Sequence, residues 1–239
     1  MESKNETKKH SSYGIKNNNI KKKKKKKVQK IIKINDKLNN GITSLIFFDL
    51  EMNCSFHKEE NHGVGETISI GAVKYNINTE EIQDFYSVIR PTFNNIMSAK
   101  ILELTKLLQD EVNGAKSFKE VFLDVDRWVN EEKCIFISWG SDDIRVLLGD
   151  NHRNGYNLDI INTIKVNFID FQSEYGYHRK SSQAISLKNA LAQYNIEFEG
   201  CQHNALDDAY NLFRVYKQYE KEICYNASLE INEEKELGS

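Results

Sequence analysis

The sequence predicts an α/β protein in which helices flank a mixed sheet of five strands. Two observations carry this prediction. Three runs rich in β-branched and aromatic residues follow one another directly, and later apolar runs alternate with segments of helical spacing. Consecutive strands favour antiparallel pairing and strands joined by helices favour parallel pairing, so both should occur in one sheet.

The first three strands are expected at residues 45–51, 67–75 and 84–89. Pro91, the only proline, ends the third strand because it cannot donate to the ladder. The segment 45–48 is apolar throughout, which is typical of a strand buried on both faces.

Helices are expected over 117–129, 142–148, 186–194 and 206–223, with strands over 134–138 and 166–172 between them. Ser117 is a candidate N-cap, and Glu120 follows three residues later, as in a capping box. The acidic segment 224–239 is expected to be a flexible tail.

Charge divides the chain into two parts. Residues 1–43 hold 14 lysines and three acidic residues, a net charge of +11, whereas the remaining residues carry −13. Few apolar side chains occur in residues 1–43, so we expect a disordered basic arm. The seven-lysine run at 21–27 is interpreted as a solvated tail, with attraction of nucleic acid or nuclear targeting as alternatives.

The four cysteines are scattered and form no Cys-x-x-Cys pair, which favours reduced thiols and argues against zinc. No segment resembles a signal peptide, and no run approaches the roughly 18 apolar residues of a membrane span. These features predict an intracellular, cytoplasmic protein with no membrane partner, or a nuclear one if the lysine run is a targeting signal. The oligomeric state stays open.

Acidic residues stand where the first predicted strand ends. Asp49 and Glu51 are two residues apart, so they project from one face of that strand. Two neighbouring carboxylates beside an apolar strand repel each other and resist desolvation. A cation would therefore stabilise them. Mg²⁺ and Mn²⁺ are candidates, because both prefer oxygen ligands.

Acidic pairs also open two of the predicted helices. Asp142 and Asp143 follow an apolar strand, and Asp207 and Asp208 follow His203. Each pair alone has a simpler explanation, since carboxylates stabilise helix N-termini, and a single histidine is more often structural. Adjacent helical residues diverge by about 100°, so only one residue of a pair can face a common site.

Three motifs occur in a fixed order along the chain. They are Asp-x-Glu at 49–51, an Asp followed by a mainly hydrophobic stretch at 143–147, and His-x-Ala-x-x-Asp at 203–208. With segments 67–73 and 104–112, they resemble the DnaQ-like, DEDDh type of 3′-to-5′ exonuclease, which has an RNase H-like fold. The resemblance covers residues 44–219 and places the exonuclease domain at 44–223.

Within that family, the resemblance is closest to Eri- and KapD-type RNA exonucleases, because of segments 51–54, 168–176 and 198–200. Three residues depart from the pattern. Lys106 replaces a usual Gly and Asn53 a common Thr, while Asp142 stands where some relatives carry an aromatic that could stack on a base.

The resemblance implies hydrolysis of phosphodiester bonds by two Mg²⁺ or Mn²⁺ ions, from the 3′ end of single-stranded RNA or of a 3′ overhang, with release of nucleoside 5′-monophosphates. The implied metal ligands are Asp49, Glu51, Asp143 and Asp208, and the implied general base is His203. The implied substrate-binding residues are Met52, Asn53, Leu107, Trp139, Ile144 and His203. A DNA proofreading or repair exonuclease and a non-catalytic nucleic-acid-binding regulatory module are the alternatives.

Overall fold

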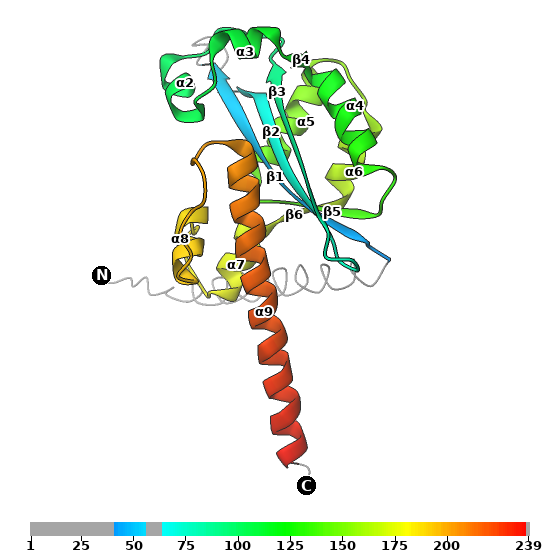
Figure 1. The fold of residues 1–239 in the computed structure, drawn as a ribbon, viewed down its shortest axis with the longest axis vertical. Coiled ribbons are helices and arrows are strands. Elements are labelled where there is room, and N and C mark those ends of the chain that lie inside the picture. Colours follow the sequence, from blue (N-terminus) through cyan, green and yellow to red (C-terminus); the bar gives the residue numbers. More distant parts are fainter. Residues whose placement is uncertain (1–40, 56–63, 238–239) are drawn as a thin grey trace, which may run out of the picture.

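The computed structural model describes residues 41–55 and 64–237, which form a sheet with helices on both faces (Figure 1). The expected basic arm lies almost wholly outside the described residues. The sheet has six strands in the order β4-β3-β2-β1-β5-β6. The strands are β1 (Ser44–Ser55), β2 (Val64–Asn76), β3 (Ile82–Arg90), β4 (Lys116–Ser117), β5 (Cys134–Ser138) and β6 (Phe168–Asp170).

Helices connect the strands and cover both faces of the sheet. In chain order they are α2 (Ala99–Thr105), α3 (Gln109–Gly114), α4 (Phe118–Val129), α5 (Asp142–Arg153), α6 (Asp159–Asn167), α7 (Phe171–His178), α8 (Leu187–Gln193) and α9 (Ala205–Leu237). None of these helices is both long enough and apolar enough to cross a membrane.

Strand pairing confirms the mixed sheet. Strand β2 lies antiparallel to β1 and to β3, whereas β1 with β5 and β5 with β6 are parallel. The sixth strand, which the sequence did not predict, is the two-residue β4, parallel to the end of β3. As expected, β3 ends directly before Pro91.

Both faces of β1 are buried, as its apolar run predicts. Phe48 joins the cluster under α4, α5 and α6, whereas Phe47 joins the cluster under α7, α8 and α9. Because side chains alternate along a strand, Asp49 and Glu51 continue the face of Phe47. That face carries α9 (Figure 1).

The helix starts are better predicted than the ends. At α4, the Ser117 hydroxyl accepts from the Glu120 N–H, and the Glu120 carboxylate accepts from the Ser117 N–H at 2.8 Å, which confirms the capping box. Helix α5 runs on to Arg153, and α9 runs on to Leu237 although its end was expected near Ile223.

The strand expected at 166–172 is wrong at both ends. Helix α6 continues to Asn167, and the strand covers only Phe168–Asp170. The Asp170 carboxylate accepts from the Ser173 N–H at 3.0 Å and from its hydroxyl at 2.7 Å. This N-cap ends the strand and begins α7 at Phe171.

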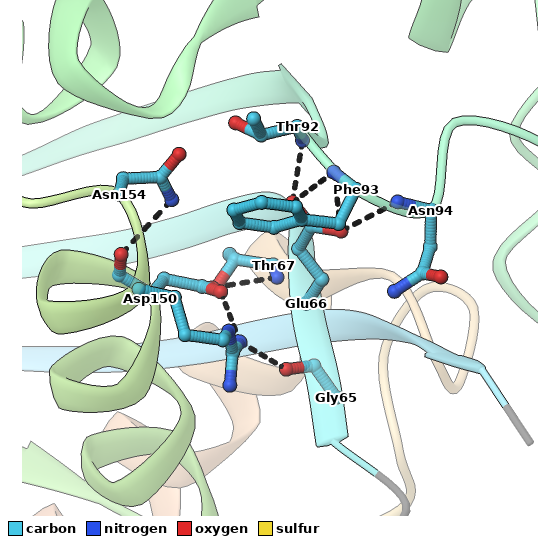
Figure 2. A network of polar contacts seen from close by, with 9 residues as sticks. Gly65, Glu66, Thr67, Thr92, Phe93, Asn94, Asp150 and Asn154 are labelled. Carbon is cyan, nitrogen blue, oxygen red and sulfur yellow. Dashed lines mark hydrogen bonds and ion pairs between the residues drawn. The ribbon is translucent and has the colours of Figure 1, made fainter. Parts of the chain in front are cut away.

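A buried carboxylate fixes the loop that follows β3. Glu66, which is 3% exposed, accepts from the backbone N–H groups of Thr92, Phe93 and Asn94, the last at 2.8 Å (Figure 2). On the next residue of β2, the Thr67 N–H and hydroxyl donate to Asp150 of α5. The start of β2 is therefore tied to this loop and to α5.

We expect Glu66→Ala to lower the free energy of unfolding by about 2–5 kcal/mol, because three backbone donors lose a charged acceptor. Urea unfolding measures the change. Glu103→Ala, which removes an exposed carboxylate, is the control and should stay within about 0.5 kcal/mol of the unchanged protein. Equal midpoints for the two variants would contradict this account of the loop.

Candidate active site

Three carboxylates meet at the end of the apolar part of β1. One oxygen atom from each of Asp49, Glu51 and Asp208 lies within 4.8 Å of the others. Two come from one face of β1, and the third comes from the first turn of α9. The chain thus brings together residues separated by more than 150 positions.

Gly71 permits this approach. It is the β2 partner of Asp49, and a Cβ built on it would lie 2.1 Å from the backbone nitrogen of Leu206 and 2.2 Å from the carbonyl carbon of Ala205. The first turn of α9 therefore rests directly on the β2 backbone. A glycine within a strand can signal such a close approach, although Gly71 was not among the residues predicted for the site.

Asp143, at the start of α5, faces the same end of β1. Its Oδ1 atom accepts from the Leu50 N–H at 3.3 Å, and the residue is 6% exposed. This hydrogen bond lies beyond the last pair of β1 and β5, at Phe47 and Ile137. The carboxylate lies outside the group of three but contributes to raising the pKa of Asp49.

The structure separates Asp207 from Asp208. The Asp207 carboxylate accepts from the Cys201 N–H at 2.7 Å, so it closes the loop before α9. Asp208 faces Asp49 and Glu51 and accepts from the His203 N–H at 2.8 Å. The spacing of five residues from His203 had favoured Asp208.

His203 is exposed and has a left-handed backbone, with φ of 65°. This conformation is uncommon outside glycine and costs on the order of 1–3 kcal/mol. The Asn204 side chain caps the following helix by accepting from the Leu206 and Asp207 N–H groups. Loop and cap together hold His203 beside Asp208. Burial raises the pKa of Asp208, and His203 opposes that rise.

Burial raises the pKa of every carboxyl in this group, and repulsion by a neighbouring carboxylate adds to the rise in each case. Burial is the largest cause, and it raises the pKa of Glu51 to about 8, of Asp143 to about 7 and of Asp208 to about 6. The pKa of Asp49 is raised well above its usual value by burial, and then by Asp143, Asp208 and Glu51. Removing these groups from water favours their neutral form.

These shifts predict how stability depends on pH in EDTA. Between about pH 4 and 8 the folded protein holds protons that the unfolded chain has released, so folding stability should fall as pH rises over this range and level off above it. Asp208→Asn removes one acid and one source of repulsion, so its melting temperature should fall less over this range. Parallel melting curves for the two proteins would contradict the prediction.

The donor set fits divalent metal ions. It consists of carboxylate oxygens alone, and within the described residues no Lys or Arg forms a salt bridge with Asp49, Glu51, Asp143 or Asp208. Buried charges without a partner need a cation, and hard cations such as Mg²⁺ and Mn²⁺ prefer oxygen.

Most of the expected substrate-binding side chains are partly engaged within the fold. The Asn53 amide donates to the Asn94 carbonyl at 2.7 Å, and the Trp139 indole donates to the Ile185 carbonyl at 3.0 Å. Leu107 and Ile144 are 7% and 9% exposed. Met52 is half-buried, and His203 is the exposed member of this set.

The fold and the carboxylate group agree with a match to a family of exonuclease domains. The chain belongs to the RNase_T exonuclease family, whose model, described as Exonuclease, matches residues 46–216. This match confirms the family resemblance drawn from the motifs.

Named relatives agree with this membership. A zebrafish (Danio rerio) protein, ERI1 exoribonuclease 2, is 29% identical over 191 residues, which is 70% of this chain and 33% of that protein. The Bacillus subtilis protein named Probable 3'-5' exonuclease KapD is 26% identical over 160 residues, 67% of this chain and 76% of that protein. The chain thus spans only about a third of the zebrafish relative.

Solved structures share the fold. The nuclease domain of 3'hExo, a DEDDh family member bound to rAMP, superposes with a TM-score of 0.66 at 24% identity. The match covers 76% of this chain and 93% of that domain.

Proposed function

We propose that this protein is a metal-dependent 3′-to-5′ exoribonuclease that releases nucleoside 5′-monophosphates. The observation that carries the proposal is the convergence of Asp49, Glu51 and Asp208, with oxygens within 4.8 Å, in a chain of the RNase_T exonuclease family. A protein that only binds nucleic acid has no need of converging, half-buried acids, so the enzyme is the better interpretation.

Asp49, Glu51, Asp143 and Asp208 would hold two Mg²⁺ or Mn²⁺ ions. When bound, such ions lower the pKa of a coordinated water and stabilise the charge on the leaving oxygen. Burial raises the pKa of Asp49, and Asp143, Asp208 and Glu51 raise it further, so its carboxylate is close to each of the other acids that would hold the ions.

His203 would act as the general base. Its exposed position beside Asp208 lets the imidazole reach water at the metal site, and imidazole is the side chain that most often takes up a proton as a general base. The left-handed backbone at His203 supports a functional role, because such strain is often retained at active sites.

RNA is the preferred substrate class because the zebrafish relative is named an exoribonuclease. Single-stranded RNA or a 3′ overhang suits this site, because the phosphate to be hydrolysed must enter between the carboxylates. Residues 44–223 would form the catalytic domain, between the basic arm and the acidic segment 224–239, through which α9 continues to Leu237.

Matched RNA and DNA oligomers labelled at the 5′ end test the proposal with Mg²⁺, Mn²⁺ or EDTA. We expect progressive shortening of RNA from the 3′ end with either metal and none in EDTA. Faster shortening of DNA would favour a proofreading or repair exonuclease. Binding of either oligomer without shortening would favour a binding module.

A further inference from the structure

Tyr86 of β3 lies in the same cross-strand row as Asp49. Asp49 pairs with Gly71, and Gly71 pairs with Tyr86. Residues directly opposite each other in antiparallel strands share a face, so Tyr86 projects from the face that carries the carboxylates. Because Gly71 has no side chain, the backbone of the first turn of α9 lies directly over it in this row.

The neighbouring row brings the Tyr86 hydroxyl toward Glu51. Glu51 pairs with Ser69, and Ser69 with Val88. The Ser69 side chain, in a residue that is 1% exposed, interacts with the Tyr86 hydroxyl. A buried partner thus orients a phenol at the edge of the carboxylate group.

Tyr86 is also accessible, since 41% of the residue is exposed. No aromatic ring packs against it among the described residues. The exposed residue at the start of α5 is Asp142, which is charged and pairs with Arg145 at 3.0 Å. It offers no aromatic ring on which a base could stack. Trp139 packs against Phe171 and Tyr175 in the core.

The charged side chains around Tyr86 limit which part of a substrate could bind there. Burial raises the pKa of the Tyr86 hydroxyl, and the nearby carboxylates of Glu111, Glu51 and Asp207 raise it further. A phosphate would be repelled at this position, whereas a neutral sugar with hydroxyl groups would not. A phenol can both donate to and accept from a sugar hydroxyl.

We propose that Tyr86 binds the sugar of the terminal nucleotide and that its hydroxyl, oriented by Ser69, hydrogen-bonds the ribose 2′-hydroxyl. Tyr86 is then a specificity-determining residue, since the 2′-hydroxyl distinguishes RNA from DNA. This inference deepens the proposed exoribonuclease function and rests on it.

Two RNA oligomers test the inference. They are identical except that the 3′-terminal nucleotide carries either ribose or 2′-deoxyribose, and removal of that nucleotide is measured as kcat/KM. Tyr86→Phe should lower kcat/KM for the ribose end roughly threefold to tenfold, mainly through KM, and leave the deoxyribose end unchanged. Tyr86→Ala should weaken both substrates, because the ring is lost as well.

Tyr210→Phe is the matched control. Tyr210 is exposed to a similar extent, at 38%, and packs against Phe213 of α9, so its variant should match the unchanged protein on both oligomers. Equal effects of Tyr86→Phe on both oligomers, or no effect, would overturn the inference while leaving the exoribonuclease intact. Failure of the unchanged protein to shorten either oligomer would overturn the proposed function itself.

Discussion

Asp49→Asn is expected to lower exonuclease activity by about a thousandfold or more while the protein stays folded. Metal ions supply several kcal/mol of transition-state stabilisation, and the variant removes a ligand and a charge while keeping the side-chain shape. Asp49 is also the carboxyl whose pKa is raised by all three of its acidic neighbours. Its melting temperature in EDTA should therefore equal or exceed that of the unchanged protein.

Asp142→Asn provides the control, because it makes the same chemical change next to Asp143. Asp142 is exposed and its contact is a surface pair with Arg145, so activity should stay within about threefold. Activity of Asp49→Asn of the same order as that of Asp142→Asn would contradict the assignment of the metal ligands.

Gly71→Ala is expected to damage both stability and activity. The new Cβ would meet backbone atoms of Leu206 and Ala205 at 2.1 and 2.2 Å, and backbone cannot rotate away as a side chain can. The first turn of α9 must then lift from β2 and carry Asp208 away from Asp49. We expect a loss of about 3 kcal/mol or more in the free energy of unfolding. Metal affinity, measured by calorimetric titration, should also fall.

Gly176→Ala is the matched control for this prediction. Gly176 lies within α7, and apart from its chain neighbours and the backbone of its own helix no described atom lies within 4 Å of a Cβ built there. Alanine favours helix over glycine, so this variant should be as stable as the unchanged protein or more so by about 1 kcal/mol. Unaltered metal affinity in Gly71→Ala would show that the close packing of α9 on β2 does not determine the geometry of the metal site.

The sequence predicted the parts of the fold that short segments encode. The apolar run before Asp49 specified a strand buried on both faces, and Ser117 with Glu120 specified the start of α4. The family motifs predicted which acids approach each other. Each motif is a short segment that can be recognised by itself, even though the site combines residues far apart in the chain. In the structure Asp208 faces the other carboxylates and Asp207 binds the loop before α9, as the motif spacing indicated.

Features that depend on distant contacts were not predicted. Helix α7 begins where Asp170 caps it, although the apolar residues around it read as one continuous strand. The register of β1 and β2 shifts between Glu51 and Met52, a bulge that no local pattern announces. The role of Glu66 depends on a loop 26 residues away, and that of Gly71 on a helix still farther along the chain.

Hydrolysis in oxygen-18 water tests the central claim most directly. A single turnover on RNA with Mg²⁺ should place the label in the phosphate of the released nucleoside 5′-monophosphate, because water attacks that phosphorus and the 3′ oxygen leaves. Asp208→Asn should abolish release of the labelled product. Label on a 3′-phosphate of the shortened RNA, a cyclic phosphate product, or undiminished release by Asp208→Asn would contradict the account.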